Sequence, residues 1–200
     1  MKAILLSVRP KWCEKIASGK KTVEVRKTCP VHGTPFKVYI YCTMQREGWF
    51  RHPGSESLCG KVIGEFVCDK ITGLTHVGAM GSMEPYKLNI LATGMYYKPA
   101  DELLKAACLS ESEAEKYLKG GDGYGWHISD LKIYDKPREL DEFYRFGFCG
   151  MNGTGVCGNE GCKHYEPSGS YMEPPTCAID GCYLKRPPQS WCYVEKLSYE

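Results

Sequence analysis

The chain has 200 residues, which suits one domain or one domain with an elaboration, and its apolar content of 42% suits a globular core. Its formal net charge of +2 excludes a protein that is strongly basic throughout, although residues 1–30 hold eight lysines and arginines against two glutamates. No apolar run resembles a signal peptide or approaches the roughly 20 residues of a membrane span, so we expect a cytoplasmic protein without a membrane partner.

The first thirty residues predict a strand, a helix and a second strand. Residues 3–8 are an apolar run that is typical of a buried strand. Pro10 fits the first turn of a helix, because its missing N–H costs nothing there, and Gly19 ends that helix in a left-handed conformation. The next residues alternate between polar and apolar, so Val23 and Val25 are expected to face a barrel interior that they share with Val38 and Ile40.

The opposite face of this second strand is a row of Thr22, Glu24 and Arg26, with Lys21 at the turn before it. Arg26 offers a planar fork of donors, Lys21 a mobile point charge, and Glu24 an acceptor or proton carrier. Three charged groups held this close suit an anionic or polar planar ligand, so they are candidate ligand-binding and catalytic residues. The alternative is a solvated strand face with one surface ion pair, which would stabilise little.

Two longer strands are predicted in the middle of the chain, at residues 36–43 and 60–71, with a polar loop at 44–58 between them. Alternation in the first of these strands places Tyr41 on the face away from the aliphatic side chains. Tyr41 is therefore a candidate for stacking on a base, with cross-strand packing as the alternative. Residues 72–97 are expected to be mostly loop.

The rest of the chain predicts short elements, with Ser110 and Glu113 at the spacing of a capping box. These elements are helices at 101–107 and 111–119, strands at 124–134 and 190–197, and a turn or short helix at 139–146. About six strands and two to four short helices predict a single α+β domain over residues 1–200, built on a small, mixed and partly open β-barrel.

Residues 149–183 form a Cys-rich insertion with almost no aliphatic side chains, so the segment cannot build its own core. We expect the twelve cysteines to be mostly reduced, and a clustered subset then favours metal over disulfides. Two Cys-x4-Cys pairs suit a structural zinc site, with loose thiols on a flexible segment as the alternative. The candidate ligands are Cys157, Cys162, Cys177 and Cys182, with Cys149 and His164 as alternates.

Four further side chains are candidate ligand contacts. Trp126 and Trp191 are each expected either to wall a base pocket or to pack in the core. His127 lies in a predicted strand, where a histidine is more often packed or hydrogen-bonded than catalytic. Ser190 lacks the neighbouring pattern of a serine hydrolase and is kept only as a ligand contact.

Several segments, in order along the chain, resemble one known family. The motif of residues 19–26 follows a short helix and resembles the Gly-x-Lys-x-x-Glu-x-Arg motif of ASCH domains, which are RNA-binding-like domains related to the PUA fold. Residues 1–10 resemble the first strand of that family, and residues 124–131 and 186–194 are similar to ASCH proteins common in phages and prophages of Gram-positive bacteria. The resemblance covers residues 1 to about 145 and 184–197, and it implies an ASCH (PUA-like) barrel.

The resemblance also implies a ligand. It favours recognition of RNA, a nucleotide or a modified nucleoside in a cleft beside Lys21, Glu24 and Arg26, by a protein that we expect to be monomeric. One alternative is a phage accessory protein that sequesters a signalling nucleotide.

The other alternative is a hydrolase, similar to bacterial N4-acetylcytidine amidohydrolases or to ASCH proteins described as ribonucleases. In such an enzyme Glu24 would act as general base and Lys21 would stabilise an oxyanion, with a pKa lowered by Arg26. Lys21 matches the motif lysine of those amidohydrolases, but Glu24 stands where they have threonine. Their second glutamate has no clear counterpart here, with three candidates in the comparable region: Glu111, Glu113 and Glu115.

Overall fold

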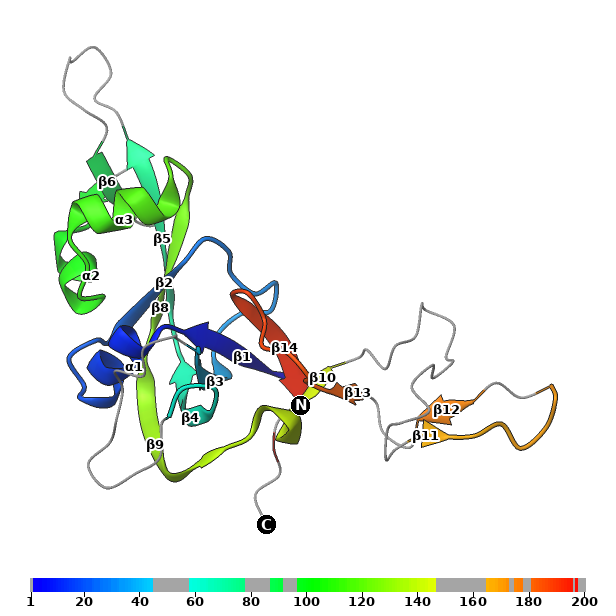
Figure 1. The fold of residues 1–200 in the computed structure, drawn as a ribbon. Helices are drawn as coiled ribbons and strands as arrows, with labels where there is room; N and C mark the ends of the chain where they lie inside the picture. The colour runs from blue at the N-terminus through cyan, green and yellow to red at the C-terminus, as the bar shows by residue number, and fades with distance from the viewer. Residues whose placement is uncertain are drawn as a thin grey trace.

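The computed structural model describes residues 2–44, 58–77, 87–91, 97–146, 165–172, 175–177, 181–195 and 197. These residues hold three α-helices, one short 3-10 helix and fourteen strands, in sheets of seven, five and two strands (Figure 1). The expected α+β class is confirmed, whereas the expectation of about six strands is too low. No pairing among the described strands closes the sheets into one barrel, and the expected barrel was likewise partly open.

The larger sheet has the strand order β13-β10-β14-β1-β3-β4-β9. Its central strand β1 runs parallel to β3 and antiparallel to β14. Both faces of β1 are covered, since every side chain from Ala3 to Val8 is at most 5% exposed. The strands of this sheet are β1 (Lys2–Val8), β3 (Phe36–Cys42), β4 (Val62–Cys68), β9 (Ser129–Arg138), β10 (Tyr144–Phe146), β13 (Gly181–Tyr183) and β14 (Trp191–Glu195).

The smaller sheet has the order β2-β8-β5-β6-β7, and each neighbouring pair is antiparallel. The expectation that residues 72–97 are mostly loop is wrong, because β5 and β6 lie there. Their pattern is weak in the sequence, since glycine and polar residues interrupt it and only Leu74 of β5 is buried. The strands are β2 (Val23–Arg26), β5 (Ile71–Val77), β6 (Lys87–Leu91), β7 (Tyr97–Pro99) and β8 (Gly123–His127); β11 (Tyr165–Glu166) and β12 (Thr176–Cys177) form a separate ribbon.

The chain passes from the larger sheet to the smaller one between β4 and β5, and it returns between β8 and β9. The strands predicted at 60–71 and 124–134 are therefore each divided, because the chain turns a corner between the sheets. At that corner the backbone N–H of Ile128 donates to the carbonyl of Thr22 at 2.9 Å. Thr22 immediately precedes β2, so the corner also fixes the start of the strand that carries the charged motif.

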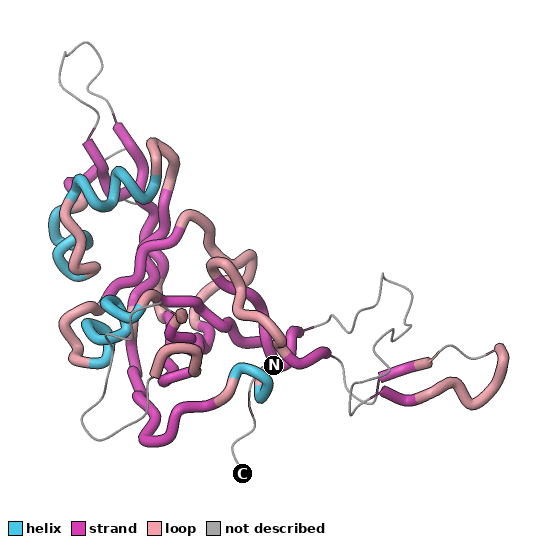
Figure 2. Tube along the Cα trace, viewed as in Figure 1, coloured by secondary structure: helices cyan, strands magenta, loops and turns pink. Residues whose placement is uncertain are grey.

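The helices begin close to where the sequence predicts. Helix α1 (Pro10–Ala17) has proline in its first turn, and α3 (Glu111–Leu118) has the predicted capping box. Helix α2 (Asp101–Ala106) begins with Asp101 as its first residue, and η1 (Leu140–Glu142) occupies the predicted turn or short helix. Figure 2 shows α1, α2 and α3 on one side of the strand-rich body. No helix in the described part of the chain is long and apolar enough to cross a membrane.

Three groups of buried side chains hold these layers together. One joins the two sheets and includes Val38, Ile40 and Trp126. A second joins the smaller sheet to α2 and α3 and includes Val23 and Val25, and a third covers the other face of the larger sheet. Val23 and Val25 were expected to share one barrel interior with Val38 and Ile40. This is wrong, because two helices cover the valine face of β2 and give it a core of its own.

Candidate functional site

Strand β2 places the charged motif beside the core that joins the two sheets. It pairs antiparallel with β8, with Glu24 directly opposite Trp126. Opposed residues of an antiparallel pair share a face, so Glu24, Arg26 and Trp126 all point toward the larger sheet. Val23 and Val25 point the other way, toward α2 and α3. The alternation predicted for this strand is thus confirmed.

Lys21, Glu24 and Arg26 form one connected ion-pair network. The Lys21 ammonium lies 3.2 Å from Oε2 of Glu24, and Nη2 of Arg26 lies 2.9 Å from Oε1 of the same carboxylate. Two backbone carbonyls also accept from the cations: Ala107 from Nζ of Lys21 at 2.5 Å, and Ser7 from Nη2 of Arg26 at 2.7 Å. Because Ser7 belongs to β1 and Ala107 follows α2, the network ties β2 to the larger sheet and to the helical layer.

The network is almost completely enclosed. Lys21, Glu24 and Arg26 are 2%, 6% and 8% exposed. The hypothesis of a solvated strand face is therefore wrong, and Lys21 is held in place rather than mobile. The sequence shows the polar face of β2, but it does not show that distant segments cover that face: Ser7 lies 19 residues before Arg26, and Ala107 lies 86 residues after Lys21.

The charges of this network do not balance. Among the described residues, two cations share one carboxylate, which leaves one positive charge in a place where an uncompensated charge is costly. Within the described residues, Nε of Arg26 and Nε1 of Trp126 are buried without a hydrogen-bond partner. Both donors belong to side chains on the same sheet face as Glu24. The site therefore has donors to spare and lacks an acceptor.

Burial lowers the pKa of Lys21, and the neighbouring Glu24 carboxylate opposes that shift. Arg26 lowers the same pKa, as expected, but burial is the larger cause. A lysine with a lowered pKa releases its proton more readily than a surface lysine. Lys21 therefore suits acid–base chemistry as well as the binding of an anion.

Trp12 of α1 connects this buried network with the surface. Its indole ring lies 4.9 Å from the Lys21 ammonium, and the ammonium groups of Lys11 and Lys15 lie 4.2 Å and 5.0 Å from the same ring. Trp12 is partly exposed, whereas Lys21 is buried. An anion that approaches α1 would therefore meet two lysines around the indole before it meets Lys21.

The predicted aromatic contacts lie at different depths. Trp126 is fully buried and Tyr41 is 4% exposed, so both rings pack in the core and neither faces solvent for stacking. Trp191 is partly exposed; its ring centroid lies 5.8 Å from that of Trp126, and its Nε1 donates to Oγ1 of Thr28 at 3.0 Å. Of these three side chains, only Trp191 is partly exposed and could contact a ligand at the surface.

His127 and Ser190 lie outside the charged network. Nε2 of His127 lies 2.9 Å from Oγ1 of Thr72, and burial lowers the pKa of the imidazole. His127 is opposite Val23 on β8, so it belongs to the sheet face that α2 and α3 cover. The Ser190 carbonyl accepts from the backbone N–H of Ser7 at 2.9 Å, which places its backbone one hydrogen bond away from the network.

Three residues of the site were not predicted as site residues. Ser7 and Ala107 contribute backbone carbonyls, and nothing in a sequence marks a carbonyl that will accept from a distant side chain. Trp12 lies within the helix predicted after Pro10, but it was not among the candidate ligand contacts. A signal was present in this case, because Lys11 and Lys15 flank Trp12 at helical spacing.

The zinc site stays a prediction. Cys149, Cys157, Cys162 and His164 lie outside the described residues. Only the backbone is described for Cys177, in β12, and for Cys182, in β13. Among the side chains that the structure describes, no three His, Cys, Asp or Glu groups are arranged to hold a metal. None of the seven cysteines with described side chains forms a disulfide.

Three solved structures of one protein overlap with this chain in part. The crystal structure of ASCH from Zymomonas mobilis has a TM-score of 0.47 at 22% identity and covers 70% of this chain and 75% of that chain. Two crystal structures of single-residue mutants of the same protein have TM-scores of 0.46 and 0.45 at 22% identity; they cover 70% and 71% of this chain, and 75% and 78% of their own. No protein-family model and no curated protein matches the sequence. The overlap identifies neither a ligand nor a reaction.

Proposed function

We propose that this protein recognises RNA, or a nucleotide or modified nucleoside, through Lys21, Glu24 and Arg26. A phosphate or carbonyl oxygen of the ligand accepts hydrogen bonds from Lys21 and Arg26. The Glu24 carboxylate accepts from an exocyclic amine of the base. The ligand thus supplies the acceptor that the network lacks, and the network supplies one acceptor in return.

One observation carries this proposal: among the described residues, a nearly buried network has two cations, one carboxylate and an Nε of Arg26 without a partner. A network that only stabilised the fold would be expected to satisfy its donors, because a buried donor without a partner costs about 1–3 kcal/mol. An oxygen-rich anion would compensate the charge and satisfy the donor together. RNA and nucleotides carry such oxygens on their phosphates, sugars and bases.

The ligand reaches Lys21 past Trp12. The Lys21 side chain is 2% exposed, so a neighbouring group must move before a ligand can contact its ammonium. Trp12 lies against that ammonium and is itself partly exposed. A phosphate attracted by Lys11 and Lys15 would replace the indole beside Lys21, exchanging a cation–π contact for a charge-assisted hydrogen bond.

The test begins with a native mass spectrum of the protein purified without added ligand, in which a bound nucleotide appears as added mass. Affinities are then measured by calorimetry for the ribonucleoside monophosphates and for random-sequence single-stranded RNA of about ten nucleotides. Lys21→Met should weaken binding about tenfold or more, the loss expected for a hydrogen bond to a charged group. Lys20→Met is the matched control, because it removes the same charge from the neighbouring, exposed position.

The control should lose affinity only slightly, and that loss should shrink as salt is added. Equal affinities in the parent and in Lys21→Met would contradict the proposal. A parent protein that binds none of these ligands would contradict it as well.

A second function, hydrolysis, is favoured by the lowered pKa of Lys21 and its contact with Glu24. In this mechanism Glu24 takes a proton from a water molecule, whose oxygen attacks the acyl carbon of an acylated nucleoside or the phosphorus of an RNA linkage. The C–N or P–O bond to the leaving group then breaks, and the leaving nitrogen or oxygen takes that proton from Glu24. Lys21 stabilises the negative charge that develops on the attacked group. Glu24→Gln should then abolish turnover by the folded variant, whose new amide oxygen still accepts from the base and so keeps part of the ligand affinity. A parent protein that binds a ligand without converting it is a binding protein only.

A further inference from the structure

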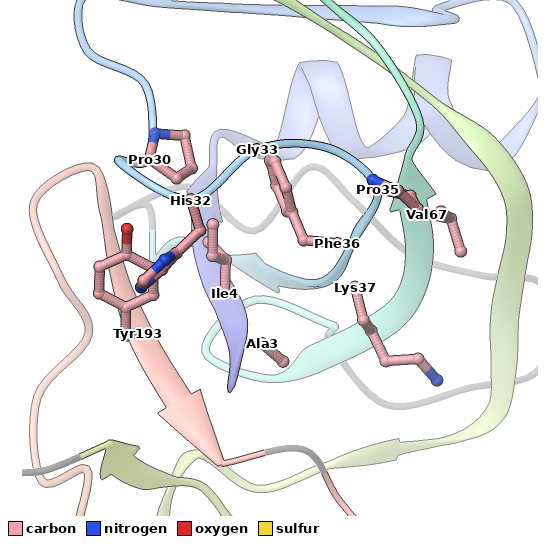
Figure 3. A pocket seen from close by; sticks show the side chains of 10 residues that line it. All are labelled: Ala3, Ile4, Pro30, His32, Gly33, Pro35, Phe36, Lys37, Val67 and Tyr193. Carbon is pink, nitrogen blue, oxygen red and sulfur yellow. The ribbon is translucent and has the colours of Figure 1, made fainter. Parts of the chain in front are cut away.

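A pocket lies beside the start of β1 (Figure 3), whereas the charged network contacts Ser7 near the end of that strand. It is lined at the starts of β1 and β3, by Ala3, Ile4 and Phe36 among others, and its volume is about 500 Å³. This volume falls within the range of small-molecule sites, about 300–1,000 Å³. Ser7, which contacts Arg26, is three residues beyond Ile4 on β1, so the pocket and the network are separated by about 10 Å along that strand.

One wall of the pocket is a loop that β14 holds in place. Thr28 accepts from Nε1 of Trp191 at 3.0 Å, and the backbone N–H of Val31 donates to the hydroxyl of Tyr193 at 3.2 Å. The ring of His32 meets the ring of Tyr193 edge-on, with the centroids 5.5 Å apart (Figure 3). Because aromatic side chains fix this loop at several points, the wall is formed before any ligand arrives.

The charge of the pocket is nearly balanced. Lys37 is the cation in its lining, and its Nζ lies 2.7 Å from the Glu65 carboxylate. The ring of Phe36 is held edge-on against Trp126, with a centroid distance of 5.5 Å. A nearly neutral hollow with aromatic and aliphatic walls fits a flat, uncharged ring better than it fits a phosphate.

We propose that this pocket binds an unpaired nucleobase, which stacks against His32 and Tyr193 and accepts a hydrogen bond from Lys37 through a ring carbonyl. The inference rests on the proposed function, because β2 leads directly from Arg26 into the wall of the pocket. Pro30 is the fourth residue after Arg26, so the two are at most about 14 Å apart along the chain. An RNA strand with one phosphate bound at the charged network therefore has a neighbouring base within reach of the pocket.

Gly33 allows the pocket to be filled without disturbing the fold. It lies in the lining, and a Cβ added there would meet no atom within 4 Å. Gly33→Phe should weaken the binding of ten-nucleotide RNA by about tenfold, since stacking of one base accounts for an effect of this size. The matched control is Gly121→Phe, which adds the same ring outside the lining, at a position with ordinary contact distances. The control should bind within about twofold of the parent, and both variants should keep the parent's unfolding midpoint.

Free ribonucleosides distinguish the two sources of a base. If they bind to the parent and are lost in Gly33→Phe, the pocket takes a free base; if only RNA shows the loss, it takes a base within a strand. Both results support the inference. His32→Ala should then lower the affinity for the same ligand by a smaller factor than Gly33→Phe does. If Lys21→Met lowers the affinity for RNA and Gly33→Phe does not, the inference about the pocket is wrong and the proposed function stands. If Gly33→Phe lowers the affinity for RNA and Lys21→Met does not, base binding in the pocket is supported and the proposed function is wrong.

Discussion

Two buried carboxylates in this protein, Glu24 of β2 and Glu65 of β4, have partners of different kinds. They are 6% and 8% exposed. Oε1 of Glu65 accepts from Lys37 at 2.7 Å, and its Oε2 accepts from the hydroxyl of Tyr134 at 2.6 Å. Glu24 contacts two cations instead, Lys21 at 3.2 Å and Arg26 at 2.9 Å. In the described part of the chain, the ion pair of Glu65 is with one cation, Lys37, whereas Glu24 contacts two, so that the Glu24 group carries a positive charge in excess.

This difference teaches how a structural ion pair can be told from a candidate binding network. A balanced pair with both carboxylate oxygens hydrogen-bonded can persist in a core, because its own partners compensate its desolvation. An unbalanced network with an unpartnered donor is costly until something else completes it. The four predictions below take the Glu65 group as structural and the Glu24 group as incomplete. They are given in order of decreasing effect on stability.

Glu24→Gln should be the most destabilising of these changes. It leaves Lys21 and Arg26 close together in a buried place without their carboxylate, and breaking such a pair costs about 3–5 kcal/mol. Glu65→Gln should cost about 1–3 kcal/mol, because Lys37 is closer to solvent and can recover hydration. Urea denaturation of both variants measures the difference. Equal losses would show that the two carboxylates are equivalent.

Lysine replacements should show the opposite asymmetry. Lys37→Met leaves the Glu65 carboxylate without its cation and should cost about 2–3 kcal/mol. Lys21→Met removes the excess charge and leaves Glu24 paired with Arg26, so it should cost about 1 kcal/mol or less even though Ala107 loses a donor. Thermal and urea unfolding give both values. A larger loss in Lys21→Met than in Lys37→Met would place Lys21 among the residues that stabilise the fold.

Ser110→Ala provides a reference value for the loss of stability, because the change involves neither Glu24 nor Glu65. The Ser110 hydroxyl accepts from the backbone N–H of Glu113 at 3.2 Å, and the Glu113 carboxylate accepts from the backbone N–H of Ser110 at 3.0 Å. Loss of such a cap typically costs about 1 kcal/mol. The same urea experiment measures it, and ligand affinity should remain that of the parent. A change in affinity would mean that α3 contributes to binding.

The pH dependence of stability should report on Lys21. Burial lowers its pKa in the folded protein below the value of 10.5 for an exposed lysine. Between the lowered value and 10.5 the unfolded chain binds more protons at this position than the folded chain does, so the free energy of unfolding rises with pH. The parent should therefore gain stability relative to Lys21→Met as the pH is raised from about 8 toward 10. Parallel curves for the two proteins would mean that burial does not shift this pKa.

Local patterns predicted the elements on which this comparison depends. The alternation in β2, the capping box at Ser110 and the proline and glycine that bound α1 all act between near neighbours, and each is confirmed. The arrangement of these elements depends on contacts between distant residues. The sequence therefore did not reveal the corner at Ile128, nor did it reveal that Ser7 and Ala107 enclose the charged row.

The aromatic candidates show the same limit. A tryptophan opposite Glu24 in the strand pairing suits both a pocket wall and a core side chain, and the sequence left both interpretations of Trp126 open. In the structure Trp126 packs in the core, and its indole N–H has no hydrogen-bond partner within the described residues. Tyr41 is similar, because both faces of β3 turned out to be covered. Periodicity shows which side chains share a face, but not what lies against that face.

The most direct test of the incomplete network is the nitrogen–proton NMR signal of Nε in Arg26, assigned by its loss in Arg26→Lys. Saturating the protein with ten-nucleotide RNA should shift this signal and slow the exchange of its proton with water, because the ligand supplies the missing acceptor. The Nε signal of Arg138, whose guanidinium pairs with Glu142 on the surface, serves as the reference and should stay in place. An Arg26 signal that is unchanged when RNA is fully bound would contradict the account.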